Sequence, residues 1–216
     1  MNDFEKTISK IELLEKEWRY ELSNVEDKEH SFGRVPEDGK TVAFWSVPRN
    51  TGEFLLFMVN LLKPKKILEL GCSVGYSTLF LAKGVNQWKG IVHTTEILKE
   101  KIELAKEHFQ DANFNQCIKL YEKDIREVLN NWEEDEKIDF VFIDADKERY
   151  QEYLEKILPL LKDDALIIVD NAGKVAMPDG SYVNCEHIDK FVKSVSHDQR
   201  LESNYLDIDN GPVSYT

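Results

Sequence analysis

The segment that decides the fold is Asp139-Phe-Val-Phe-Ile-Asp-Ala-Asp-Lys147. Its apolar middle predicts a short buried strand, which ends in acidic side chains and a lysine. A second apolar run, Ala165-Leu-Ile-Ile-Val169, ends in Asp170 and Asn171. Ligands of an open α/β sheet bind at the carboxyl ends of its strands, so we expect these side chains to converge. The oxygens of Asp144, Asp170 and Asn171 suit Mg²⁺ or Ca²⁺, not zinc.

A glycine loop lies upstream of these two strands. The stretch Glu69-Leu-Gly-Cys-Ser-Val-Gly-Tyr-Ser77 follows a third apolar strand and runs into a helical pattern. Gly71 and Gly75 let the backbone approach a ligand closely, and a helix N-terminus would point at it. The loop has neither the third glycine of the dinucleotide fingerprint nor the lysine of a phosphate-binding loop. The next strand ends in Glu96, placed to accept from both ribose hydroxyls. The pattern indicates a nucleoside ligand without a long phosphate chain.

Together these pieces resemble the S-adenosylmethionine-dependent O-methyltransferases of the catechol and caffeoyl-coenzyme A type. The resemblance runs from about Ser46 to Thr216 and is strongest at Ile67–Thr78, Phe142–Lys147 and Ile168–Asn171. It implies an α/β, Rossmann-like methyltransferase fold, with a seven-stranded mostly parallel sheet, a C-terminal antiparallel hairpin and helices on both faces. It also implies methyl transfer from S-adenosylmethionine to a hydroxyl of a small catechol-like or hydroxycinnamoyl-type acceptor. Mg²⁺ is the first choice of divalent cation, with Ca²⁺ or Mn²⁺ as alternatives.

The resemblance also gives roles to single positions. It makes Lys147 the general base beside Asp144, although a lysine titrates near 10.4 and needs a cation or burial to become neutral. It makes Asp144, Asp170 and Asn171 the metal ligands. The positions that match cofactor-binding residues of the family are Glu69, Gly71, Cys72, Ser77, Glu96, Asp124 and Asp146.

The acidic candidates also have plainer explanations. Asp124, Asp144 and Asp146 precede predicted helices, and aspartate is a favoured N-cap residue. Asp170 and Asn171 are both residues that favour turns.

The remaining candidates have alternatives of their own. Lys147 could form a weak surface ion pair with Glu148 or Glu152. Glu96 could be a surface acid at a strand end. Glu69 lies inside an apolar strand, where an unpaired charge is costly, so we expect it to have a partner. Cys72 is best explained as a small residue that permits close approach, because no basic neighbour is placed to activate its thiol.

Composition agrees with a single acidic enzyme domain. The chain has 216 residues, 42% of them apolar, which suffices for one sizeable core. A net charge of −13 disfavours nucleic acid as a partner. The three cysteines are odd in number and widely spaced, so neither a disulfide framework nor a zinc site is expected. No signal peptide or membrane span is recognisable, and we expect a soluble cytoplasmic protein without a membrane partner.

Short apolar runs alternate with helical spacing along the chain, as is typical of α/β architecture. Strands are expected near 66–70, 91–95, 118–121, 140–143, 165–169, 201–208 and 213–216, and helices near 51–62, 77–82, 98–109, 125–132, 150–161 and 185–196. The last two strands are joined by the short turn Asp209–Pro212 and must therefore be antiparallel.

The first 45 residues are expected to be an accessory segment, before a methyltransferase domain over 46–216, within one globular unit. Apolar residues between Phe4 and Leu22 recur at helical intervals. Packing on the domain is the simpler role for this helix, and a homodimer contact or a lid is the alternative. The charged stretch Asp27–Lys40 predicts a connection over the rim of the sheet.

Two segments depart from the family pattern, and both are expected to face the acceptor. They are Phe44–Thr51 and Ala172–Val183. The acceptor is therefore less defined than the chemistry. Two further functions are compatible with the motifs: O-methylation of a hydroxyuridine in tRNA, and S-adenosylmethionine binding without turnover.

Overall fold

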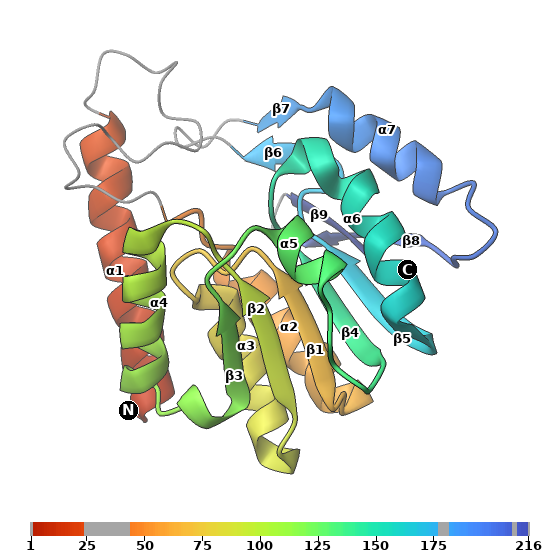
Figure 1. Ribbon diagram of the computed structural model, residues 1–216. Helices are drawn as coiled ribbons and strands as arrows, with labels where there is room; N and C mark the ends of the chain where they lie inside the picture. The colour runs from red at the N-terminus through yellow and green to blue at the C-terminus, as the bar shows by residue number, and fades with distance from the viewer. Residues whose placement is uncertain (1, 24–43, 177–181, 209–210, 216) are drawn as a thin grey trace.

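The structure, a computed structural model, describes residues 2–23, 44–176, 182–208 and 211–215 (Figure 1). At its centre is a seven-stranded sheet in the order β3-β2-β1-β4-β5-β9-β8. The parallel strands are β1 (Lys66–Leu70), β2 (Ile91–Thr95), β3 (Ile118–Tyr121), β4 (Ile138–Ile143) and β5 (Leu161–Val169). At one edge β9 (Gly211–Tyr215) and β8 (Asn204–Ile208) form an antiparallel hairpin. The predicted α/β fold class and terminal hairpin are confirmed.

Helices cover both faces of the sheet (Figure 1). One face carries α1 (Asp3–Ser23), α2 (Arg49–Leu62), α3 (Tyr76–Val85) and α4 (Lys99–Asp111). The other carries α5 (Ile125–Asn130), α6 (Tyr150–Ile157) and α7 (Glu186–Val195). Short 3₁₀ turns flank them at Asn86–Trp88, Asn115–Cys117, Lys147–Arg149 and Leu158–Leu160.

The core has two layers because neighbouring side chains of a strand point to opposite faces. In β4, Phe140 and Phe142 pack with α1 to α4, whereas Val141 and Ile143 pack with α5 to α7. All four side chains are fully buried. Burial on both faces explains why the parallel strands appear in the sequence as continuous apolar runs.

The predicted element boundaries are wrong where α6 ends and β5 begins. The helix expected to reach Leu161 ends at Ile157, and β5 begins at Leu161 instead of Ala165. Leu161 pairs with Ile138 across an irregularity of β4, and Lys162 forms an ion pair with Asp139 of β4. These cross-strand contacts explain why the charged residues 162–164 belong to a strand although their sequence has no strand pattern.

Two further differences concern shorter elements. Helix α5 ends at Asn130, two residues before the expected limit. The departing segment after Asn171 contains an unexpected small antiparallel sheet of β6 (Lys174–Ala176) and β7 (Tyr182–Asn184).

The N-terminal helix packs on the domain, as the simpler interpretation predicted. Phe4, Ile8 and Ile11 of α1 are buried in the same core as α2, α3 and α4. The Phe4 ring meets the Phe80 ring of α3 edge-on, with 5.2 Å between the centroids. The expected connection Asp27–Lys40 and residues 209–210 of the terminal turn lie outside the described residues.

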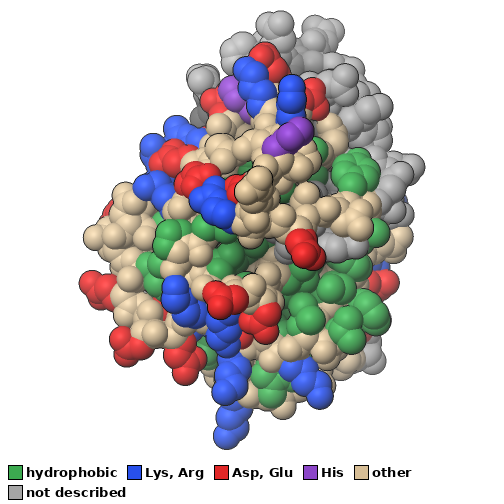
Figure 2. Space-filling model, turned by 90° about the vertical axis from the view of Figure 1, so that its right-hand side faces the viewer, with side chains coloured by type: hydrophobic (Ala, Val, Ile, Leu, Met, Phe, Trp, Pro, Cys, Tyr) green, Lys and Arg blue, Asp and Glu red, His purple; other side chains and the backbone are tan. Residues whose placement is uncertain are grey.

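The surface carries mixed charge on the face around α7. Acidic and basic side chains are interspersed there, without a continuous basic stripe (Figure 2). Within the described ranges, none of the helices combines the length and apolar character needed to cross a bilayer. On α2, Phe57 and Leu61 are each 62% exposed, so this helix presents apolar side chains to solvent.

Candidate active site

The carboxyl ends of five parallel strands meet at one rim, and backbone hydrogen bonds tie them together. Asp144 N donates to Leu70 O at 3.0 Å, and Asp170 N donates to Ile143 O at 2.9 Å. On the other side of β1, Cys72 N donates to Thr95 O, and Glu96 N donates to Tyr121 O. The strand-end residues selected from the sequence therefore lie on neighbouring strands.

Lys147 stands at the centre of a partly buried polar cluster. Its Nζ donates to Asp144 Oδ1 at 2.6 Å and to Tyr150 Oη at 2.8 Å. Tyr150 Oη in turn donates to the carbonyl oxygen of Asp170 at 3.5 Å. The tyrosine is fully buried, so its hydroxyl fixes the position of the lysine between two strand ends. The alternative partners of Lys147, Glu148 and Glu152, make no ion pair with it among the described residues.

Burial and neighbouring charges shift the pKa values of the groups in this cluster. Burial raises the pKa of Asp170 to about 7, and the nearby Asp144 carboxylate adds to the rise. Burial is the largest single effect on Lys147 and disfavours its charged form, but Asp144, Tyr150 and Asp170 together outweigh it and raise the lysine pKa above its ordinary value. Lys147 is therefore an ammonium group in this arrangement. Burial alone therefore does not make Lys147 neutral in this arrangement.

Asp144 and Asp146 have different surroundings, although both were candidates for helix capping. Asp146 is the cap: its Oδ1 accepts from Glu148 N at 3.2 Å, and its carboxylate pairs with Arg149 at 3.1 Å. Asp144 instead faces Lys147. A cofactor contact of Asp146 stays a prediction, whereas the capping alternative describes its local geometry.

Asn171 follows Asp170 in the left-handed region, with φ of 56°. Asparagine tolerates this conformation better than most residues. The backbone N–H of Asn171 lowers the pKa of the Asp170 carboxyl by hydrogen bonding, against the larger effect of burial. Within the described ranges, no cluster has three or more His, Cys, Asp or Glu side chains placed to hold a metal. The predicted ligand set contains only two such residues, and its third donor is an amide.

The glycine loop lies against the Asp144 strand end. Gly71 has φ of 98°, and a Cβ atom built on it would lie 2.0 Å from the backbone oxygen of Asp144. Only glycine fits both the conformation and the space. Gly75 has φ of 89°, and a Cβ there would lie 2.5 Å from the Phe109 ring of α4. The loop that should receive the cofactor thus contacts the strand that carries the proposed catalytic acid.

Glu96 belongs to the same wall as the loop. Its Oε2 accepts from Ser73 N at 2.9 Å, and its Oε1 accepts from Ile97 N and Leu98 N at 2.8 and 3.0 Å. Ser73 Oγ also donates to the Phe44 carbonyl oxygen. These contacts bring Glu96, the glycine loop and the departing segment around Phe44 together.

Glu69 is buried, and three hydroxyl groups are its hydrogen-bond partners. Ser77 donates to Oε1 at 2.6 Å, and Thr78 and Thr94 both donate to Oε2 at 2.5 Å. Burial raises the pKa of Glu69 to about 7, and the hydroxyls lower it in part. The Glu69 side chain thus connects β1, β2 and the start of α3, and these contacts stabilise the conformation of the loop.

Cys72 and Asp124 complete the predicted cofactor set. Cys72 is buried beside Thr78, and burial raises the pKa of its thiol far above the ordinary value, which excludes a nucleophilic thiolate. The Asp124 carboxylate caps α5 and accepts from Arg126 N, Nε and Nη2 at 2.8 to 2.9 Å. Its predicted place near the adenine is not tested by these contacts.

Comparison with known proteins identifies the family. The sequence profile of the O-methyltransferase family matches residues 34–214. The chain belongs to the S-adenosylmethionine-dependent O-methyltransferase family. Flavonoid 3',5'-methyltransferase of Vitis vinifera is 31% identical to it, over 78% of each chain. Caffeoyl-CoA O-methyltransferase 1 of Zea mays is also 31% identical, over 74% of this chain and 67% of its own.

Solved structures agree with this assignment. The O-methyltransferase of Bacillus cereus in complex with SAH matches with a TM-score of 0.69 at 26% identity, covering 79% of this chain and 81% of its own. The SAH-bound methyltransferase of Podospora anserina matches with a TM-score of 0.70 at 25% identity, covering 94% of this chain and 86% of its own.

Two site residues of this O-methyltransferase were not found from the sequence. Tyr150 was assigned only to a helix start, and its hydroxyl contact with Lys147 depends on the turn between them. His108 of α4 is fully buried and its Nδ1 donates to the carbonyl oxygen of Val74 in the glycine loop, at 2.8 Å. A spacing of three residues from Lys147 could have indicated Tyr150, whereas no local signal indicates His108.

Proposed function

We propose that this O-methyltransferase methylates a hydroxyl of a small catechol-like or hydroxycinnamoyl-type acceptor with the help of a divalent cation, Mg²⁺ first. One observation carries the proposal: two carboxylates on neighbouring strand ends converge with Lys147 against the glycine loop. The loop supplies the methyl donor side, and the acidic strand ends supply the acceptor side. Their contact through Gly71 and Asp144 would align the two reactants, which is the main requirement of an in-line methyl transfer.

The cofactor side is supported by the loop and by Glu96. Bound SAH in the Bacillus cereus and Podospora anserina structures supports the same nucleoside ligand here. Glu96 would accept from the ribose hydroxyls, since its carboxylate already lies within hydrogen-bond distance of the loop backbone. Glu69, Cys72 and Ser77 would act beneath the cofactor by holding the loop in shape.

The donor set fits a hard divalent cation. Asp144, Asp170 and Asn171 would hold it, because carboxylate and amide oxygens are the preferred protein ligands of Mg²⁺ and Ca²⁺. The Asp144 carboxylate raises the pKa of Asp170, so the two acids repel each other, and a bound cation would relieve this repulsion. Such an ion supplies Lewis-acid stabilisation of the acceptor oxyanion and templating of vicinal hydroxyls.

Lys147 can act on the acceptor in two protonation states. As an ammonium group it donates to an acceptor oxygen and orients it. To act as a general base, Lys147 must first lose its ion pair with Asp144, because the Asp144 carboxylate stabilises the protonated form of the lysine. Tyr150 holds Nζ in place in both cases.

The acceptor class follows from the relatives. The Vitis vinifera and Zea mays enzymes are named for flavonoid and caffeoyl-CoA acceptors, which are hydroxylated aromatic compounds. The segments around Phe44 and after Asn171 differ from the family pattern, and loops on a rigid scaffold are where specificity usually changes. We therefore assign a small hydroxylated aromatic acceptor and leave its ring substituents to experiment.

Methyl transfer from labelled S-adenosylmethionine to catechol and caffeoyl-type acceptors tests the proposal. Turnover should require Mg²⁺ and stop in excess EDTA. Asp170→Ala should abolish metal-dependent turnover while S-adenosylhomocysteine (SAH) still binds in calorimetry. The matched control is Asp163→Ala, since Asp163 is an exposed acid of the same strand. Full turnover in EDTA, or loss of SAH binding in Asp170→Ala, would contradict the metal assignment.

A further inference from the structure

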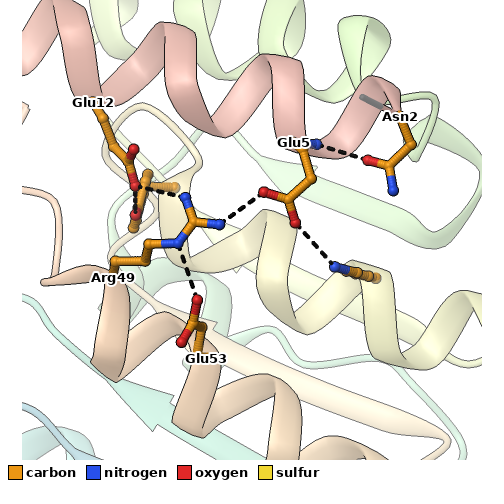
Figure 3. Close-up of polar contacts among 7 residues, drawn as sticks. Asn2, Glu5, Glu12, Arg49 and Glu53 are labelled. Atoms are coloured by element: carbon orange, nitrogen blue, oxygen red, sulfur yellow. Dashed lines mark hydrogen bonds and ion pairs between the residues drawn. The ribbon is translucent and has the colours of Figure 1, made fainter.

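Arg49 joins the N-terminal helix to the rest of the domain (Figure 3). It is the first residue of α2, and its guanidinium donates to Glu5 Oε2 at 2.7 Å and to Glu12 Oε1 at 3.3 Å, both on α1. Its Nε donates to Glu53 of its own helix at 3.0 Å. Arg49 also lies in the segment Phe44–Thr51, which departs from the family pattern.

The stability of the fold does not explain why an arginine occupies this position. A positive charge at the start of a helix opposes the helix dipole, so Arg49 is unfavourable for α2 by itself. Its side chain is 39% exposed and those of Glu5 and Glu12 are 33% and 38% exposed, and such ion pairs add little to stability. The buried apolar side chains of α1 already dock the helix. Among its three contacts with acids, the arginine also restrains the carboxylate of Glu12, at 3.3 Å.

Glu12 passes this constraint to the glycine loop. Tyr76 Oη donates to Glu12 Oε1, the oxygen that also accepts from Arg49, at 2.7 Å. Tyr76 directly follows Gly75 and is the first residue of α3. Burial raises the pKa of the Tyr76 phenol above its ordinary value, and the Glu12 acceptor adds to the rise, so the phenol remains a donor.

The rest of the loop is held by contacts from other elements. Ser73 is fixed by Glu96 and by the Phe44 carbonyl, and the Val74 carbonyl oxygen is held by His108. Tyr76 is thus the loop-end residue whose anchor comes from α1. Without that anchor, the turn from Gly75 into α3 would lose one of its restraints, while Glu69 would still hold Ser77 and Thr78.

We propose that Arg49, Glu12 and Tyr76 form a positioning relay through which the N-terminal helix holds the glycine loop in its cofactor-binding shape. The inference rests on the proposed cofactor site and adds a part of the chain that does not touch the cofactor. A loop held in the bound shape loses less conformational freedom on binding, so the relay should increase cofactor affinity. The methyl-transfer step itself should be unaffected once the cofactor is bound.

A double-mutant cycle on Glu12→Ala and Tyr76→Phe tests the relay, with SAH affinity measured by calorimetry. Each single variant should raise the SAH dissociation constant about fivefold, the size of one lost hydrogen bond, and the double variant should be no worse than either. Arg49→Gln should also raise the SAH dissociation constant about fivefold. Arg49→Lys, which keeps a positive charge, should raise it less than Arg49→Gln does. Glu53→Ala is the matched control, because it removes a contact of the same arginine that stays within α2. In turnover assays, KM for S-adenosylmethionine should rise while kcat stays within about twofold.

The outcomes separate this inference from the proposed function. Wild-type protein that fails to bind SAH would refute both. Wild-type protein that binds SAH, with Glu12→Ala and Tyr76→Phe indistinguishable from Glu53→Ala, would refute the relay alone. Additive losses in the double variant would also refute it, because they would show that the two side chains act separately. Unfolding midpoints of all variants within a few degrees of wild type would exclude a general loss of folding as the cause.

Discussion

Replacing Glu69 with glutamine should change how the stability of the protein responds to pH. Glu69 is fully buried, and burial raises its pKa from 4.5 to about 7 even though three hydroxyl groups favour the charged form. The unfolded chain loses this proton near 4.5 and the folded chain near 7. The folded state therefore binds the proton more tightly, and it loses stability as pH rises between these values.

The size of the effect follows from the two pKa values. At about 1.4 kcal/mol per pH unit, the interval from 4.5 to about 7 corresponds to about 3 kcal/mol. Below pH 4.5 this cost is absent, and above pH 7 it is constant. The isoelectric point is about 4.9, so measurements should begin near pH 5.5, which leaves about 2 kcal/mol of the change in range. Glutamine does not titrate and should lack this slope.

Urea unfolding of both proteins at about pH 5.5 and about pH 8 measures the difference. The free energy of unfolding of Glu69→Gln, relative to wild type, should shift by about 2 kcal/mol in favour of the variant at the higher pH. An overall offset between the proteins is expected from altered hydrogen bonding with Ser77, Thr78 and Thr94 and does not affect the test. Two stability profiles that run parallel over this range would show that Glu69 titrates normally, and the reasoning from its burial would be wrong.

Three further predictions concern the loop, the cofactor and the acceptor. Gly71→Ala should cost more than about 2 kcal/mol in urea unfolding and abolish SAH binding, because its Cβ would strike the Asp144 backbone at positive φ; a stable variant that still binds SAH would show that the chain tolerates a side chain at this close approach. Glu96→Ala should weaken SAH binding by about 1.5–3 kcal/mol in calorimetry, and unchanged affinity would make it a surface acid. Exchanging Gly173–Val183 for the segment of a catechol methyltransferase should alter the methylated products seen by mass spectrometry; an identical product profile would place this segment away from the acceptor.

The parallel strands could be predicted closely because their patterning is local. The limits of β1, β2 and β3 coincide with the apolar runs identified in the sequence. Burial favours apolar residues in such strands, and each of the three ends directly before a glycine or a glutamate. The convergence of Asp144, Asp170 and the loop followed from the same pattern, since parallel strands bring their carboxyl ends to one rim.

Features that depend on contacts between distant segments could not be predicted. The first residues of β5 are charged and become a strand only through pairing with β4. The contact between Tyr76 and Glu12 joins residues 64 apart in the chain, and the contact between His108 and Val74 joins residues 34 apart. Nothing in the local spacing of these residues distinguishes them from ordinary helical positions.

The Asp-Ala-Asp-Lys motif shows why the local contacts of an acid can be ambiguous in sequence and definite in structure. Both aspartates precede a helical turn, so both qualified as caps. The turn begins at Lys147, which makes Asp146 the residue whose carboxylate reaches the free N–H of Glu148. Asp144 still belongs to the strand end, where its backbone N–H is bound by Leu70 and its carboxylate faces Lys147. The capping of the turn by Asp146 thus leaves the carboxylate of Asp144 available for the chemistry of the rim.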